Sequence, residues 1–169
     1  MKVGFIGLGI MGKPMCRNLM KAGYEAVVYN RSKASVEELA AEGAQAAGSP
    51  VAENCQVIIT MLPNSPQVRE VCLGENGIAS AAKEGTIVID MSSIDPVQSK
   101  EIGAELNKKG IDLMDAPVSG GEPKAIDGTI SVMVGGSKEN FDKYYDLLMA
   151  MAGSVVYVGE LGSGNVAKL

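Results

Sequence analysis

Residues 2–12 of the chain read KVGFIGLGIMG, and this stretch decides the fold. The apolar run Lys2–Ile6 has the composition of a buried strand, and a helical pattern follows the glycines. Between them, Gly7, Gly9 and Gly12 make a G-x-G-x-x-G pattern. The pattern alone is weak evidence, because the chain contains 21 glycines. Between a strand and a helix it indicates a dinucleotide-binding turn, with a βα turn that binds nothing as the alternative.

Each glycine has its own task in such a turn. Gly7 permits the tight bend, Gly9 lets the backbone approach a pyrophosphate, and Gly12 lets the helix pack against the strand. The helix N-terminus adds free N–H groups and the positive end of its dipole. The candidate pyrophosphate-binding residues are Gly7, Leu8, Gly9, Ile10, Met11 and Gly12.

Strand-like and helix-like segments alternate along the rest of the chain. The predicted strands are Lys2–Ile6, Glu25–Tyr29, Val57–Met61, Thr86–Asp90, Ile111–Asp115, Thr129–Val134 and Ser154–Val158. The predicted helices are Ile10–Ala22, Ser32–Glu42 with Ser32 as N-cap, Asp95–Lys109 and Lys138–Met151. This order predicts an α/β fold of Rossmann type: a doubly wound, mostly parallel sheet with helices on both faces.

The last residues do not fit that domain. We assign residues 1–161 to the nucleotide-binding domain. Residues 162–169 read GSGNVAKL, which is typical of a glycine turn entering a new helix. One turn of helix is not stable alone, so we expect a second domain to continue from it.

Composition excludes several classes of function. There are 15 Lys and Arg against 20 Asp and Glu, a net charge of −5, with 4% aromatics and no Trp, which argues against nucleic-acid binding. No apolar run is long enough for a membrane span, and the N-terminus does not resemble a signal peptide. Three cysteines without a CxxC motif indicate reduced thiols, so we expect a cytoplasmic protein. The absence of His removes catalytic triads and His-containing zinc sites, and we expect no metal.

The end of the second predicted strand bears on the choice of dinucleotide. An NAD site usually has Asp or Glu here, whereas this chain has Asn30, Arg31 and Ser32. Asn30 does not repel a 2′-phosphate, and Arg31 can bind one bidentately with Ser32 as a further donor. The sequence therefore predicts that NADP(H) is preferred, with NAD(H) possible. The alternative is that Arg31 is a solvated charge at a helix start.

Polar loops follow three later strands, at the edge where open α/β sheets bind ligands. They are Met61-Leu62-Pro63-Asn64, Asp90-Met91-Ser92-Ser93 and Asp115–Gly121. Each alone is readily explained as a turn, but their shared edge favours a site. Ser119, Gly120 and Gly121 offer a hydroxyl and consecutive N–H groups suited to a carboxylate.

Lys168 is the remaining candidate for chemistry. A lysine in the first turn of a helix is most often simply solvated. Beside a cofactor, desolvation would lower its pKa and allow it to act as a general acid. Its position alone does not decide between the two.

Taken together, these motifs resemble the β-hydroxyacid dehydrogenases, the 3-hydroxyisobutyrate dehydrogenase family related to 6-phosphogluconate dehydrogenase. The resemblance runs from residue 1 to 169, through the glycine loop, the three polar loops and Gly162-x-Gly164-x-x-x-Lys168. Within the family, MLPNSP (61–66) and DAPVSGGEPKAIDG (115–128) look most similar to the bacterial tartronate semialdehyde reductases of glyoxylate and glucarate breakdown.

The resemblance implies a role for each motif. The glycine loop binds the pyrophosphate, and Asn30, Arg31 and Ser32 face the adenosine ribose. Lys168 matches the catalytic lysine. The implied cleft residues are Met61, Leu62, Pro63 and Val68, Ser93 lies near the nicotinamide, and the implied substrate-binding residues are Ser119, Gly120 and Gly121.

The resemblance also implies a reaction. Hydride passes to the aldehyde carbon of a small carboxylate aldehyde, tartronate semialdehyde, while Lys168 protonates the oxygen and glycerate forms. Other semialdehyde reductases, such as those for 3-hydroxyisobutyrate or succinate semialdehyde, and a non-catalytic NADP-binding module are the alternatives. The family has a helical second domain that this chain lacks, and the full-length protein is expected to be a homo-oligomer. Close relatives can carry an acidic residue where this chain has Asn30.

Overall fold

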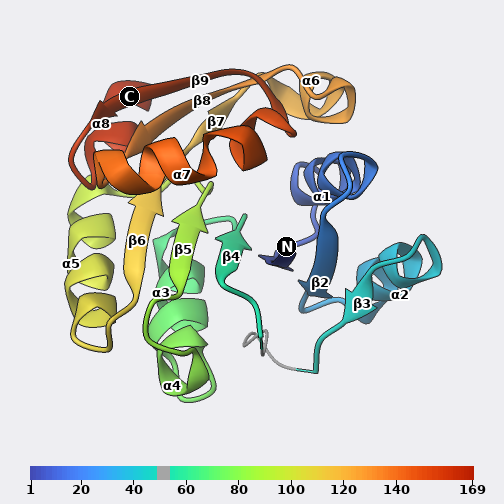
Figure 1. Ribbon diagram of the computed structural model, residues 1–169, viewed down its shortest axis with the longest axis horizontal. Coiled ribbons are helices and arrows are strands. Elements are labelled where there is room, and N and C mark those ends of the chain that lie inside the picture. The colour runs from blue at the N-terminus through green and yellow to red at the C-terminus, as the bar shows by residue number, and fades with distance from the viewer. Residues whose placement is uncertain (49–53) are drawn as a thin grey trace.

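The structure is a computed structural model that describes residues 1–48 and 54–169 (Figure 1). Within these residues, nine strands form one sheet. The strands are β1 (Lys2–Ile6), β2 (Glu25–Tyr29), β3 (Gln45–Ala46), β4 (Val57–Thr60), β5 (Ile87–Asp90), β6 (Asp112–Asp115), β7 (Val118–Ser119), β8 (Ile130–Gly135) and β9 (Ala152–Gly159). The helices are α1 (Gly12–Lys21), α2 (Lys33–Ala41), α3 (Ser65–Leu73), α4 (Ile78–Ala81), α5 (Pro96–Asn107), α6 (Gly121–Asp127), α7 (Lys138–Met149) and α8 (Ser163–Lys168).

The sheet is parallel over six strands, in the order β3-β2-β1-β4-β5-β6. The strand order reverses at β1, which lies between β2 and β4. In open α/β sheets, ligands bind at the carboxyl ends of the strands beside such a reversal. Beyond β6, β8 runs antiparallel to β6 and β7 runs antiparallel to β8, while β9 is parallel to β8. The predicted doubly wound, mostly parallel fold is confirmed.

Two apolar cores lie on opposite faces of the sheet. One contains side chains of α1, α6 and α7, and the other contains side chains of α3, α4 and α5. Alternate residues of a strand enter different cores: Phe5 belongs to the first core and Ile6 to the second. Strands buried on both faces explain the continuous apolar runs in the sequence. In Figure 1, α7 lies alongside β8 and β9 in the upper part of the view.

Several boundaries differ from the sequence predictions. The first helix begins at Gly12, not at Ile10, and Ile10 is 71% exposed in the loop. Ser32 does precede α2, but its side chain makes no capping hydrogen bond, whereas Asp95 caps α5 by accepting the Val97 N–H at 2.8 Å. Helices α3, α4 and α6 and the two-residue strands β3 and β7 were not predicted, because they are short or carry little apolar periodicity.

Candidate functional site

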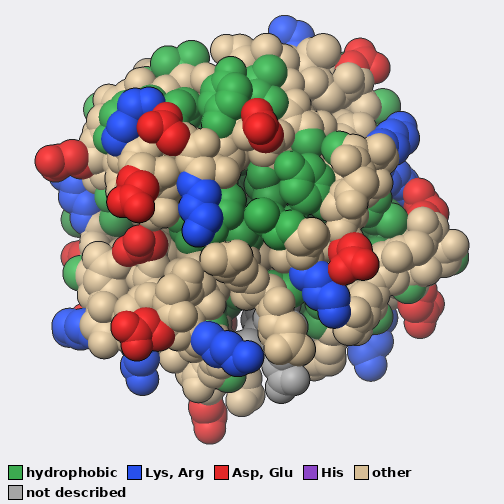
Figure 2. Space-filling view, in the orientation of Figure 1, with side chains coloured by type: hydrophobic (Ala, Val, Ile, Leu, Met, Phe, Trp, Pro, Cys, Tyr) green, Lys and Arg blue, Asp and Glu red, His purple; other side chains and the backbone are tan. Residues whose placement is uncertain are grey.

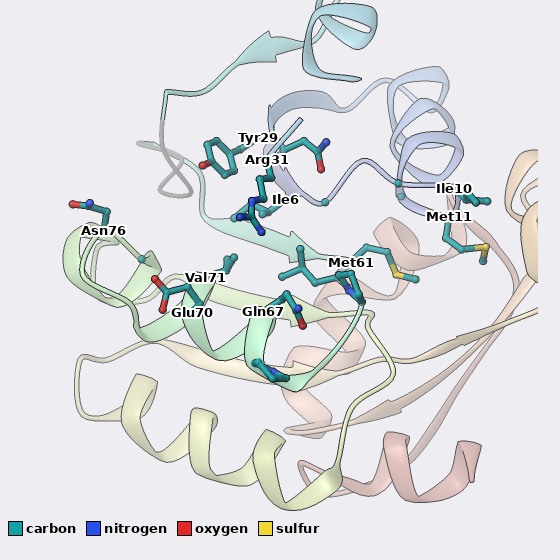
Figure 3. A pocket seen from close by; sticks show the side chains of 18 of the residues that line it. Ile6, Ile10, Met11, Tyr29, Arg31, Met61, Gln67, Glu70, Val71 and Asn76 are labelled. Atoms are coloured by element: carbon teal, nitrogen blue, oxygen red, sulfur yellow. The ribbon is translucent and has the colours of Figure 1, made fainter. Parts of the chain in front are cut away.

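A cleft of about 960 Å³ opens at the carboxyl ends of β1, β2 and β4 (Figure 3). Its walls are the β1–α1 loop, the end of β2, the β4–α3 loop, and α3 with the residues after it. The lining residues are Ile6, Gly7, Gly9, Ile10, Met11, Gly12, Tyr29, Asn30, Arg31, Met61, Leu62, Pro63, Pro66, Gln67, Glu70, Val71, Glu75, Asn76 and Gly77. The cleft therefore lies at the strand-order reversal.

The three glycines of the loop do different work. Gly7 has φ +101°, and a Cβ on it would lie 2.1 Å from the Met61 carbonyl oxygen. A Cβ on Gly12 would lie 1.9 Å from the Gly7 carbonyl oxygen. A Cβ on Gly9 would meet nothing within 4 Å. Gly7 and Gly12 are thus required by the packing of the protein itself, whereas Gly9 leaves bare backbone facing open space.

Asn30 holds this loop in place from the end of β2. Its Oδ1 accepts the Leu8 N–H at 2.9 Å, and its Nδ2 donates to the Ser32 carbonyl oxygen at 3.0 Å. Both polar ends of the side chain are therefore engaged within the protein. Arg31 is exposed and projects from the end of β2 into the cleft toward α3 (Figure 3). It is the cationic side chain in the cleft lining.

A second cluster surrounds Lys168, which α8 carries. Lys168 Nζ donates to Ser93 Oγ at 2.8 Å and to the Val118 carbonyl oxygen at 2.5 Å. Val118 directly precedes Ser119 and Gly120. The cluster therefore joins the loop after β5, the strand β7 and the end of α8, although none of these residues lines the cleft described above.

Two aspartates are buried side by side beneath these loops. Asp90 and Asp115 are paired in register on β5 and β6, and each is at most 1% exposed. Asp90 Oδ1 accepts from Thr60 Oγ1 at 2.9 Å and from the Ser92 N–H at 3.1 Å, whereas its Oδ2 has no hydrogen-bond partner among the described residues. Burial raises the pKa of Asp90 to about 6, against hydrogen bonds from Ser92 and Thr60 that lower it. Burial also raises the pKa of Asp115.

Residues 2–159 match the family described as the NAD binding domain of 6-phosphogluconate dehydrogenase. The chain belongs to this family. The chain is 47% identical over 169 residues to the mitochondrial 3-hydroxyisobutyrate dehydrogenase of Mus musculus, covering 99% of this chain and 50% of that protein. It is 42% identical over 171 residues to the 2-hydroxy-3-oxopropionate reductase of Escherichia coli strain K12, covering 100% of this chain and 58% of that protein.

Among solved structures, that of Psf3 in complex with NADP⁺ and 2-OPP has a TM-score of 0.93 and 32% sequence identity, over 98% of this chain and 60% of that one. The chain thus spans 50% to 60% of the length of these three relatives. The resemblance inferred from the motifs is confirmed at the level of the family. The mouse and E. coli relatives are a dehydrogenase and a reductase by name.

The residues of this 6-phosphogluconate dehydrogenase-type domain fit a dinucleotide. Gly9 faces open space where a pyrophosphate needs to approach the backbone. The cleft continues from there to Arg31 and α3, so it has room for a nucleotide beyond the pyrophosphate. Its volume lies within the range usual for cofactor sites, roughly 300–1,000 Å³.

Some of the other predicted cofactor-binding residues line the cleft and others lie outside it. Met61, Leu62 and Pro63 line the cleft. Leu8 is 1% exposed and points into a core, so only its backbone is available to a ligand. Val68 is fully buried in the other core, beneath the cleft wall. Ser32 is exposed and lies outside the cleft lining.

The sequence reasoning missed one whole wall of the cleft, built by α3 and the turn after it. The missed lining residues on this wall are Pro66, Gln67, Glu70, Val71, Glu75, Asn76 and Gly77, and those missed at the ends of β1 and β2 are Ile6 and Tyr29. A usable signal was present, because Asn64-Ser65-Pro66 is a common helix start with Pro in the first turn. Helix α3 was nevertheless not predicted, because the segment Ser65–Leu73 has few apolar residues in helical spacing.

The candidate metal ligands, the cysteines and the apolar helices of the described residues bear on whether these residues meet the requirements of a metal site, a reactive thiol or a membrane span. Over residues 1–48 and 54–169, no group of three or more His, Cys, Asp or Glu side chains is arranged to hold a metal ion. Cys16, Cys55 and Cys72 are free and buried, and burial raises the pKa of each, that of Cys16 to about 12. No helix in these ranges has the length and apolar character that crossing a membrane requires.

Charge is spread over the visible face of the molecule. Figure 2 shows Lys and Arg side chains interspersed with Asp and Glu, with apolar side chains gathered near the middle. This face shows no continuous stripe of basic side chains.

Proposed function

We propose that the protein is an NADPH-dependent reductase of a small aldehyde-bearing carboxylate, and that tartronate semialdehyde, reduced to glycerate, is the substrate. The observation that carries this proposal is the anchored ammonium of Lys168, beside Ser119-Gly120-Gly121 and on the same sheet edge as the cleft. An ammonium group beside a loop that suits a carboxylate could protonate the carbonyl oxygen of a substrate whose carboxylate the loop holds. The 42% identity to the E. coli reductase supports the choice of substrate.

In this proposal the nucleotide lies along the cleft. Gly7–Gly12 hold the pyrophosphate, Arg31 pairs with the 2′-phosphate, and Met61, Leu62, Pro63 and the wall above Val68 contact the rest. Ser93 faces the nicotinamide end, and Ser32 serves as a further donor at the ribose. The exposed guanidinium of Arg31 supports the preference for NADP(H), and NAD(H) remains a weaker substrate because Asn30 does not replace the usual carboxylate.

Lys168 is the proposed general acid. A lysine ammonium has three N–H donors, of which Ser93 Oγ and the Val118 carbonyl oxygen accept two. The third is free to donate to the substrate carbonyl oxygen. When bound, the reduced nicotinamide supplies the hydride that the carbonyl carbon accepts. Lys168 gives its proton to the oxygen, so the aldehyde becomes an alcohol, and the neutral amine is reprotonated from solvent.

The substrate carboxylate is assigned to the loop after β7. Ser119 is half-buried, while Gly120 and Gly121 are exposed and have φ of +133° and +70°. Backbone N–H groups in such a turn point in a common direction and suit an anion. Holding the carboxylate there would bring the adjacent aldehyde toward Lys168, because Val118 links the loop to the lysine.

A second substrate has support of its own. The chain is 47% identical to the mouse 3-hydroxyisobutyrate dehydrogenase, so methylmalonate semialdehyde chemistry on the same residues is the alternative. The two substrates differ by a methyl against a hydroxyl beside the carboxylate. For the whole protein we further propose that residues 1–161 form the nucleotide-binding domain, and that it acts in the cytoplasm as a homo-oligomer.

The deciding experiment is a substrate panel on the full-length protein. Tartronate semialdehyde, methylmalonate semialdehyde and succinate semialdehyde are each offered, at equal concentrations, with NADPH and with NADH. Oxidation of the coenzyme is followed by the loss of the absorbance of the reduced nicotinamide. Highest kcat/KM with tartronate semialdehyde and NADPH supports the proposal. If the protein binds the coenzyme but does not oxidise it with any of the three aldehydes, it is instead a non-catalytic module.

A further inference from the structure

The helix that carries Lys168 is too short to fix its own position. α8 has six residues, and an isolated helix of this length is not stable in water. Its N-cap residue is Gly162, so the helix has no capping side chain of its own. The position of Lys168 must therefore be set by contacts with the rest of the protein.

Asp115 supplies the missing cap from the end of β6. Its Oδ1 accepts the Gly162 N–H at 2.9 Å, and its Oδ2 accepts the Asn165 N–H at 2.8 Å and Asn165 Nδ2 at 3.3 Å. A carboxylate at a helix N-terminus satisfies free N–H groups and is attracted by the helix dipole. Burial opposes the charge of Asp115, and these hydrogen bonds favour it.

The packing around this cap is tight. A Cβ on Gly135 would lie 2.4 Å from Asp115 Oδ1, and a Cβ on Gly164 would lie 2.6 Å from the Met133 carbonyl oxygen. The first turn of α8 therefore lies directly against the ends of β6 and β8. There is little room for α8 to shift while the Asp115 contacts remain.

Asn165 connects the Asp115 cap to the loop that contains Ser93, a hydrogen-bond partner of Lys168. It is 3% exposed, its Oδ1 accepts the Ile94 N–H at 3.1 Å, and its Nδ2 also donates to Ser99 Oγ at 3.2 Å. Ile94 follows Ser93, whose hydroxyl accepts from Lys168. Asp115, Asn165, the Ser93–Ile94 loop and Lys168 thus form a closed ring of contacts, and Val118 lies three residues after Asp115 on the same segment.

We propose that Asp115 is the positioning residue for Lys168: its buried carboxylate fixes the start of α8 and, through Asn165, the loop that holds the lysine amine. This inference rests on the proposed function, in which Lys168 is the proton donor. A small displacement of a catalytic group lowers turnover strongly without preventing binding. Because Asp115 lies outside the cleft lining, coenzyme binding does not depend on it.

The test compares Asp115→Asn with Asp112→Asn in the full-length protein. The amide leaves one acceptor and turns an NH₂ group toward an N–H donor, whereas Asp112 is exposed on the same strand and serves as the control. We expect Asp115→Asn to lower kcat at least tenfold, with KM for the aldehyde and Kd for NADPH within twofold of the parent. Unchanged kcat would overturn the proposal.

A spectroscopic readout separates positioning from simple destabilisation and from loss of the reductase reaction. The ordered Lys168 ammonium should give a ¹H–¹⁵N cross-peak from Nζ, assigned by its absence in Lys168→Arg. In Asp115→Asn this peak should disappear while the backbone amide peaks of the glycine loop stay in place. If that variant does not fold, Asn165→Ala removes the link to Ile94 and should weaken the same peak.

The outcomes are distinguishable. A Nζ peak that persists in a folded Asp115→Asn or Asn165→Ala variant contradicts the positioning role, whatever the activity. A parent protein that reduces no aldehyde, with a Nζ peak that does depend on Asp115, contradicts the proposed reductase function and leaves the structural coupling standing.

Discussion

The two ends of the sheet's carboxyl edge are built in different ways. At β1 and β4, the key feature is the open space beside the backbone of Gly9. At β5, β7 and α8, side chains converge: Lys168 reaches Ser93 and Val118, which are 75 and 50 residues away in the chain. Adding an atom to the first region should therefore weaken coenzyme binding. Removing a polar group from the second region should lower turnover.

Removing the amine of Lys168 should have the largest effect. Lys168→Ala in the full-length protein deletes the proposed proton donor, and we expect kcat to fall at least about a hundredfold, within the range usual for a general acid. The glycine-loop region is untouched, so the Kd for NADPH should stay within about twofold. Steady-state kinetics and fluorescence titration of NADPH measure the two quantities.

Lys109→Ala is the matched control, because Lys109 is exposed in the turn that follows α5. It should leave both quantities unchanged. Full turnover in Lys168→Ala would remove the general-acid role, and a parallel loss of NADPH affinity would show that the two regions are not independent.

Asp90, at the end of β5 and hydrogen-bonded to Thr60 of β4, should make stability depend on pH. Its pKa is raised by burial from 3.8 to about 6, so the folded protein binds this proton more tightly than the unfolded chain does. The stability gained in this way is fully present below the unfolded pKa and is lost as pH rises through about 6. A shift of about two pKa units corresponds to roughly 3 kcal/mol at most.

Asp90→Asn should remove this dependence, since a neutral amide keeps the acceptor for Thr60 and Ser92. Urea unfolding at about pH 4 and about pH 7.5 should show the variant gaining stability relative to the parent at the higher pH. Asp112→Asn, at an exposed position, should show no such change. Equal pH profiles for parent and Asp90→Asn would contradict the assigned pKa.

The same contrast explains what the sequence could predict. The glycine loop is local, and its strand, turn and helix occupy consecutive residues, so residues 2–12 identify both the fold and the cleft. The contacts of Lys168 depend on how β5, β7 and α8 pack together, and no short stretch of sequence predicts that packing. Asp115 was seen only as part of a polar loop, because its hydrogen bonds to Gly162 and Asn165 span 47 and 50 residues.

A single added methyl group should separate packing from binding within the glycine loop. In Gly9→Ala the new Cβ meets nothing within 4 Å, so stability should change little, while the approach of the pyrophosphate is blocked. We expect the Kd for NADPH to rise about thirtyfold, or roughly 2 kcal/mol. Calorimetric titration and thermal unfolding give both values.

Gly12→Ala is the contrasting variant, because its Cβ would lie 1.9 Å from the Gly7 carbonyl oxygen. It should lower the free energy of unfolding by about 1–3 kcal/mol, the usual effect of overpacking. If Gly9→Ala lost stability and kept its affinity for NADPH, the open space at Gly9 would not be the pyrophosphate site.

The smallest expected effect concerns the choice of coenzyme at Arg31. Arg31→Ala removes the cation that faces the cleft, so the Kd for NADPH should rise about tenfold, or roughly 1.4 kcal/mol, while that for NADH stays within twofold. Lys33→Ala is a suitable control, because Lys33 is a nearby exposed cation outside the cleft lining. Since a 2′-phosphate contact is largely electrostatic, the NADPH preference of the parent should also weaken with added salt, and that of Arg31→Ala should not. Equal losses for the two coenzymes would mean that Arg31 contacts the adenosine itself, and the coenzyme preference would then need another origin in this region.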